Sequence, residues 1–114
     1  MPERTFEFEG ITCTIKRLKI RDTEKRDRIE AVVKGQPYAF AFADFQTSTV
    51  KIDGAGIELL ENTGDIGAVE AAFEQFRDLD EAFLIRWQEE KRLLLLPVVV
   101  QGEDKKKKSS PSAS

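Results

Sequence analysis

The sequence predicts an α+β fold in which a small antiparallel β-hairpin at the N-terminus packs on a mostly helical body of three to four helices. Apolar and polar residues alternate over residues 6–15, and apolar residues recur at helical spacing over residues 66–94. The chain has 114 residues, 40% of them hydrophobic and eight of them phenylalanine, which suits a single modest core. We expect one domain over residues 1–102 and a disordered Lys- and Ser-rich tail over residues 103–114.

The stretch FEFEGITCTIKRL, residues 6–18, predicts two strands folded back at Glu9-Gly10. Every second residue on either side of this point is apolar, as in a half-buried strand pair. Gly10 supplies the turn, because glycine reaches positive φ without strain. A lone hairpin is marginal in water, so we expect a covering layer from the later helices and a third strand from residues 50–52 or 98–100.

Residues 23–33 are predicted to form a surface helix that Asp22 or Thr23 can cap and that Gly35 can stop. The segment QPYAFAFADFQ that follows fits two structures. Tyr38, Phe40 and Phe42 alternate as on one face of a strand. A helical spacing is also present, in Tyr38, Ala41, Phe42, Phe45 and Thr49. Pro37 at the start and three alanines favour a helix, with a short extended piece after it at residues 50–52.

The C-terminal third gives the strongest helical signal, with apolar residues at intervals of three and four: Ile66, Val69, Phe73, Phe76, Leu79, Phe83, Trp87 and Leu94. Asp78 with Glu81 three residues later resembles a capping box, which divides this stretch into helices over residues 66–77 and 79–95. Pro97 should end the second helix, because it lacks a backbone N–H. Residues 98–100 would then be a β-type triplet.

The residue inventory argues against an enzyme. The chain has no histidine, which removes the commonest general base and metal ligand and excludes Ser-His and Cys-His triads. The single cysteine, Cys13, lies at an apolar position of the hairpin, so we expect a buried core residue rather than a nucleophile. One cysteine cannot form an intramolecular disulfide and fits a reducing, cytoplasmic compartment.

The spacing of the remaining candidate residues does not match known catalytic, calcium-binding or nucleotide-binding motifs. Carboxylates cluster as neighbours at residues 78–81 and 89–90, and adjacent residues of one helix do not converge on a cleft. The IDGAG loop is no calcium loop, because Lys51 and Leu60 stand where ligands are required. No GxGxxG or Walker motif occurs. We predict no catalytic, cofactor-binding or metal-binding residue.

Charge and hydropathy argue against nucleic acid and membrane partners. The net charge is −3 with no basic face, and the lysines at residues 105–108 lack interleaved aromatics. No signal-peptide pattern opens the chain. The most apolar run, LLLLPVVV at residues 93–100, is far shorter than the roughly 18 residues that cross a bilayer.

A protein-binding surface is the class that remains. The aromatic stripe of the C-terminal helices is expected to be mostly core, but an uncovered part of it would mark a partner site. The candidate partner-binding residues are Phe76, Phe83, Trp87 and Leu94. Trp87, flanked by Arg86 and Gln88, is the candidate for the partner-facing end.

Three stretches follow one another along the chain: FEFEGITCTIKRLKIRD, a hairpin and a charged helix start; FAFADFQTSTVKIDG, a Phe-Ala segment running into Thr-x-Thr-Val and a turn; and AAFEQFRDLDEAFLIRWQEE, a helix with a late Trp. This layout resembles the tail assembly chaperones of long-tailed (siphovirus-type) phages and prophages, over nearly the whole chain.

The resemblance implies a non-enzymatic protein of the host cytoplasm that binds the tape-measure protein while tail tube subunits polymerise around it. Its partners would be the tape-measure protein and the tail tube protein, and a homo-oligomer is compatible with this role. Two alternatives stay open. One is a small structural or connector protein, head-tail or minor tail, that persists in the virion; the other is a generic protein-binding module that uses the hairpin edge for strand addition.

Overall fold

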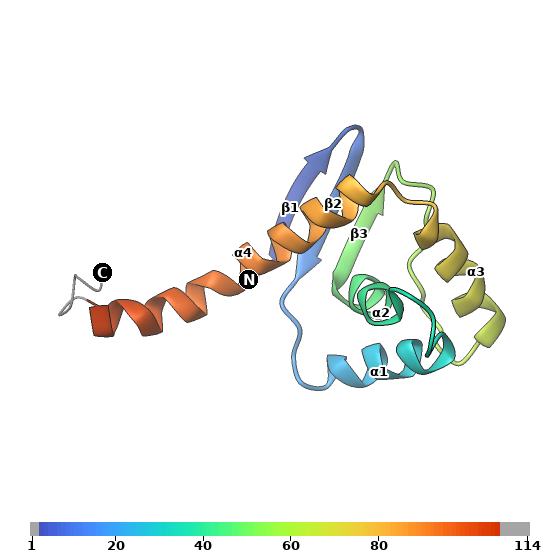
Figure 1. Ribbon diagram of the computed structural model, residues 1–114, viewed down its shortest axis with the longest axis horizontal. Coiled ribbons are helices and arrows are strands. Elements are labelled where there is room, and N and C mark those ends of the chain that lie inside the picture. Colours follow the sequence, from blue (N-terminus) through green and yellow to red (C-terminus); the bar gives the residue numbers. More distant parts are fainter. Residues whose placement is uncertain (1–2, 108–114) are drawn as a thin grey trace.

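The computed structural model describes the backbone of residues 3–107 and the side chains of residues 3–96. This part of the chain forms a three-stranded antiparallel sheet and four helices (Figure 1). The predicted class, an N-terminal hairpin with a mostly helical body, is therefore confirmed.

The hairpin consists of β1 (Glu3–Phe8) and β2 (Ile11–Lys16), paired antiparallel with Phe6 opposite Cys13. The two residues between the strands have positive φ, 46° at Glu9 and 88° at Gly10. A two-residue turn with positive φ at both positions matches the twist of the flanking strands. The predicted fold-back at Glu9-Gly10 is confirmed.

The third strand is β3 (Thr49–Asp53), which pairs antiparallel with β2 and gives the order β1-β2-β3. Thr14 opposes Lys51 while Ile15 opposes Thr49, so Val50 is the extra residue of a bulge. Of the two candidates for the third strand, residues 50–52 are thus confirmed. The alternative, residues 98–100, is wrong, because these residues lie in a helix.

The first two helices are α1 (Asp22–Val32) and α2 (Ala39–Ser48). Helix α2 confirms the helical interpretation of the ambiguous Tyr38 to Phe45 segment. The predicted caps of α1 are wrong. Its N-cap is Arg21, because the Asp22 carboxylate instead accepts from the backbone N–H of Lys19, and Thr23 donates to the Ile20 carbonyl.

The last two helices are α3 (Ile66–Arg77) and α4 (Glu81–Lys107). The predicted break between them is confirmed, but Asp78 does not cap α4. Asp78 is the C-cap of α3, where its N–H donates to the Gln75 carbonyl at 3.1 Å and the next N–H, of Leu79, donates to the Phe76 carbonyl at 3.0 Å. Asp80 caps α4 instead, since its carboxylate accepts from the Ala82 N–H at 2.9 Å.

Pro97 does not end the second helix, contrary to the prediction, and α4 continues to Lys107. A proline inside a helix removes one hydrogen bond and costs about 3 kcal/mol, which disfavours the helix without forbidding it. The helix includes residues 103–107 of the predicted disordered tail; residues 108–114 lie outside the described part of the chain.

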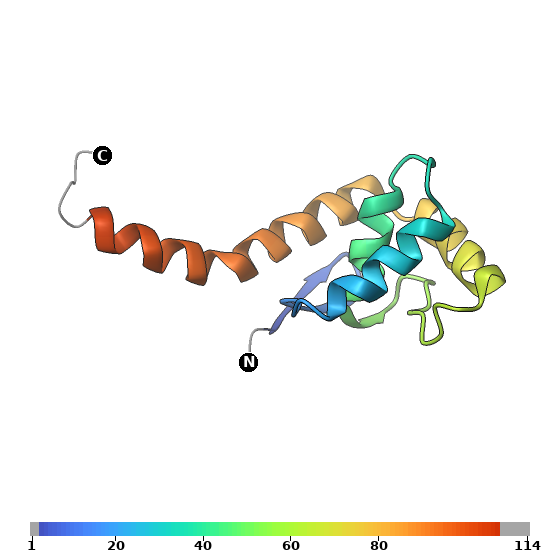
Figure 2. The same cartoon turned by 90° about the horizontal axis from the view of Figure 1, so that it is seen from below.

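One face of the sheet is covered by helices. The first half of α4 runs across β1 and β2, while α1 packs on α2 and α3 farther along the body (Figure 1). Seen from below, the second half of α4 extends away from the body (Figure 2). The hairpin therefore receives its cover from the far end of the sequence.

The core is a cluster of aromatic rings centred on Phe45. The centroid of its ring lies 5.4 Å from Phe76, 6.3 Å from Phe83 and 5.5 Å from Trp87. The Phe83 ring in turn stacks on Phe6 of the hairpin at 5.9 Å. Helix α2 thus joins both C-terminal helices and, through Phe83, the sheet.

A buried glutamine secures the segment between β3 and α3, residues 54–65, which has no regular secondary structure. The Gln46 amide donates to the Glu58 carbonyl at 3.0 Å and accepts from the Leu60 N–H at 2.8 Å. Because its amide has these partners, Gln46 can be buried within the core without a large desolvation cost.

Phe45→Ala should lower the free energy of unfolding by about 3 to 5 kcal/mol, because it removes the ring at the centre of the cluster. Phe40→Ala is the matched control, since Phe40 lies on the same helix but is 51% exposed; it should cost less than about 1 kcal/mol. Urea unfolding monitored by Trp87 fluorescence measures both, and equal losses would contradict the assignment of Phe45 to the core.

Candidate protein-binding site

The four candidate partner-binding residues lie in the core. Phe76, Phe83, Trp87 and Leu94 are each no more than 7% exposed. The Trp87 indole N–H donates to Thr49 Oγ1 at 3.1 Å, so this residue is not the exposed end of the stripe. A partner could reach Phe83, Trp87 and Leu94 only by displacing their contacts within the chain, whereas Phe76 lines an open groove.

The thiol of Cys13 is fully buried, as the alternation of the hairpin predicts. Burial raises its pKa to about 12, and a hydrogen bond with Thr49 only partly offsets this effect. The thiolate that a nucleophile or metal ligand requires is therefore not populated at neutral pH.

No group of three or more Cys, Asp or Glu residues that could hold a metal ion occurs in the part of the chain with described side chains. Within the same part, no helix has both the length and the apolar character to cross a membrane.

A largely buried polar cluster, not anticipated from the sequence, joins α4 to α2 and α1. The Lys91 ammonium donates to both carboxylate oxygens of Asp44, at 2.8 and 2.9 Å, and to Ser48 Oγ at 2.8 Å. Arg26 of α1 also donates to Asp44, at 3.1 Å. Ser48 is fully buried, so this Ser-Lys contact is sealed from substrates and serves packing.

A second buried carboxylate joins α4 to the sheet. Glu90 accepts hydrogen bonds from Arg4 of β1 and from Arg86 one turn earlier on α4. Burial acts to raise the pKa of Glu90, but the hydrogen bonds and charges of the two arginines outweigh it and hold the pKa below its ordinary value. Glu90 is thus an anchoring anion rather than an acid catalyst.

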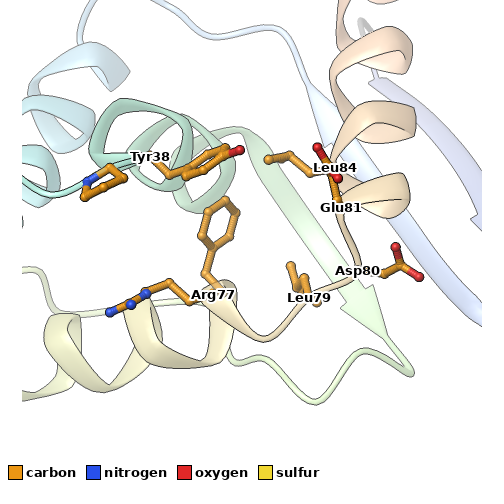
Figure 3. A pocket seen from close by; sticks show the side chains of 8 residues that line it. Tyr38, Arg77, Leu79, Asp80, Glu81 and Leu84 are labelled. Carbon is orange, nitrogen blue, oxygen red and sulfur yellow. The ribbon is translucent and has the colours of Figure 1, made fainter.

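A groove of 420 Å³ lies where the ends of α2, α3 and α4 meet (Figure 3). Tyr38 from the start of α2, Leu79 from the α3–α4 connection and Leu84 from α4 project toward its interior. Its lining residues are Pro37, Tyr38, Phe76, Arg77, Leu79, Asp80, Glu81 and Leu84. Apolar side chains form most of its walls, and charged ones stand at its border.

Tyr38 has a left-handed backbone, with φ of 70°, and its side chain is 58% exposed. This conformation costs a residue other than glycine about 1 to 2 kcal/mol. It places a large aromatic ring in the wall of the groove rather than in the core. Strain of this kind persists where the surrounding structure holds it, and it often accompanies a binding surface.

Two of the three charged residues at the border of the groove, Arg77 and Asp80, already have structural partners. Arg77 forms an ion pair with Glu74 at 3.1 Å, and the Asp80 carboxylate caps α4. The two carboxylates that line the groove, Asp80 and Glu81, are adjacent in sequence. The groove is therefore a mostly apolar pocket with a polar border. Such a pocket fits an apolar side chain of a protein partner better than a reacting substrate.

Comparisons with protein-family models, with curated proteins and with solved structures found no match to this chain. Fold and residue chemistry are therefore the basis of the functional assignment.

Asp44→Asn should lower the free energy of unfolding by about 3 kcal/mol, because Lys91 and Arg26 would keep their positive charges without the carboxylate. Asp53→Asn is the control, since its ion pair with Lys51 is exposed and should contribute less than about 1 kcal/mol. Denaturant unfolding distinguishes the two; a similar small loss in both would show that the buried cluster contributes little.

The contribution of Glu90 to the free energy of unfolding should depend on pH. Folding lowers its pKa, so the ionised group stabilises the fold above the ordinary range near pH 4, and this stabilisation is lost as pH falls toward the lowered folded-state value. Glu90→Gln should therefore destabilise the protein at pH 7, and progressively less as the pH is lowered through and below about 4.

Thermal unfolding of wild type and Glu90→Gln across this pH series measures the effect. Glu70→Gln on the exposed side of α3 should show almost no difference at any pH. A Glu90→Gln difference that stays constant down to pH 3 would contradict the lowered pKa.

Proposed function

We propose that this chain is a non-enzymatic protein-binding domain. The groove between α2, α3 and α4 carries the proposal, because most of its wall is apolar and two of its three charged border residues, Arg77 and Asp80, already have partners within the chain. Its size admits one or two large apolar side chains of a partner. A helix that presents such side chains on one face is the simplest occupant.

Within this class, the chain acts as a tail assembly chaperone of a siphovirus-type phage or prophage. The resemblance of the three sequence stretches supports this assignment. The client is the tape-measure protein, whose helical apolar side chains the groove receives, and the protein works in the host cytoplasm while tail tube protein polymerises. The acidic character of the chain helps keep the complex in solution.

The test uses the purified tape-measure protein encoded by the same phage or prophage, with its dissociation constant measured by biolayer interferometry. Tyr38→Asn removes the aromatic ring from the groove while asparagine tolerates the left-handed backbone, so stability should stay within about 1 kcal/mol of wild type. The dissociation constant should rise about tenfold or more.

Phe40→Asn is the control, because Phe40 is a similarly exposed aromatic of α2 that does not line the groove. Unchanged affinity in Tyr38→Asn would place the client site elsewhere. Absence of wild-type binding would overturn the chaperone assignment.

The connector function makes the opposite prediction for the mature particle. A chaperone leaves before the tail is complete, whereas a connector or minor tail protein remains. Mass spectrometry of purified virions should detect at most traces of this chain, and recovery at a fixed copy number per particle would favour the connector.

A further inference from the structure

The second half of α4 leaves the body of the protein, and in two perpendicular views no other described element lies beside it (Figures 1 and 2). The apolar run LLLLPVVV, residues 93–100, falls where the helix departs. Leu94 is buried against the body, but Leu95 is 42% exposed. Eight apolar residues in succession place apolar positions on more than one side of a helix.

A row of residues spaced alternately by four and three runs along α4, as in the seam of a coiled coil. Its members are Ile85, Glu89, Arg92, Leu96, Val99, Glu103 and Lys106. The first three are exposed; Ile85 is 59% exposed, and the side chains of Glu89 and Arg92 are 48% and 58% exposed. Within one chain Arg92 donates to Glu89 along the surface of the helix, and this exposed pair contributes little, so both side chains can pair with a second copy. The opposite side of the helix packs into the body through Phe83, Trp87 and Leu94.

The charges along this row are ordered so that two antiparallel copies of the row place opposite charges next to each other. When two copies of α4 are laid antiparallel about a point between residues 97 and 98, Glu89 opposes Lys106 and Arg92 opposes Glu103. Leu96 opposes Val99 at the centre. We propose that two copies of this chain associate through this face of α4, as an antiparallel helix pair with a twofold axis beside Pro97.

A second copy of the chain fits this face because the same helix carries both the acidic and the basic member of each charge pair. A twofold axis repeats each contact, so the pair contains two apolar contacts flanked by four charge pairs. A parallel pair would instead place Arg92 against Arg92 and Glu103 against Glu103. The overlap of residues 89–106 corresponds to about 27 Å of helix.

The dimer is independent of the proposed function, because it uses the solvent side of α4 rather than the groove. Sedimentation equilibrium of the full chain tests it over a concentration series from micromolar to hundreds of micromolar. One chain has a mass of 12.9 kDa, and the wild type should approach twice that mass. Added salt should weaken the association, since exposed charge pairs are screened.

Charge reversal tests the register. Arg92→Glu sets two glutamates opposite each other across the helix pair, and Glu103→Arg sets two arginines opposite each other. Each single variant should therefore raise the dimer dissociation constant by about tenfold or more. The double variant Arg92→Glu/Glu103→Arg should regain dimerisation, as should an equimolar mixture of the two single variants. Only an antiparallel pair predicts that the double variant dimerises without a second variant present.

Lys34→Glu is the control, because it makes the same kind of charge reversal at an exposed position just after α1, and α1 lies apart from the projecting half of α4 (Figure 1). It should dimerise as the wild type does, and circular dichroism should show every variant folded. A wild type that stays monomeric throughout, or single variants that dimerise normally, would overturn the proposal. A double variant that remains monomeric would overturn the antiparallel register.

Discussion

The packing of α4 across the hairpin is the contact on which the rest of the structure depends. The Phe83 ring lies 5.9 Å from Phe6 and 6.0 Å from Phe8 on β1, and 6.3 Å from Phe45 on α2. A two-stranded hairpin is marginal in water, and this ring closes the apolar face of the sheet against α2. Because the ring comes from the far end of the sequence, the core forms only when both ends of the domain have met. We infer that hairpin and C-terminal helix stabilise each other.

Charged side chains then fix how α4 is rotated about its axis. Glu90 bonds to Arg4 of β1, and the next residue, Lys91, bonds to Asp44 of α2. Successive residues of a helix point about 100° apart, so two adjacent anchors to two different elements allow one rotation of α4. Buried ion pairs often add little net stability compared with apolar packing, so we infer that the main effect of these two anchors is to fix the geometry of α4. This rotation leaves Ile85 and Arg92 toward solvent, and the proposed dimer face is thus a consequence of where the anchors lie.

Periodicity predicted the hairpin and α3 to within a few residues, because these patterns are local in the sequence. At α2 periodicity fitted both a strand and a helix, and Pro37 with three alanines favoured the helix; β3 was one of two candidates for the third strand. The end of α4 was missed because the effect of Pro97 is an energetic cost that the surrounding helix can bear. The N-cap of α4 was assigned to Asp78 instead of Asp80 because the two residues are only two positions apart, and the backbone conformation at the end of α3 decides between them.

The groove could not be predicted, since it joins Tyr38 to Leu84 across a long stretch of chain. The anchors were missed for the same reason, as Asp44 and Lys91 carry no local signal.

The edges of the sheet bear on how a partner can bind. Among residues 3–107, the sheet has the order β1-β2-β3 and no further strand pairs with either outer strand, which permits strand addition. Edge strands that avoid such pairing are short, charged or bulged. Strand β3 has five residues, includes Lys51 and Asp53, and is bulged at Val50; β1 presents Glu3 and Glu7 as exposed residues. These features oppose pairing with another strand. The hairpin is therefore better suited to being a scaffold, and the helical groove and α4 to contacting other proteins.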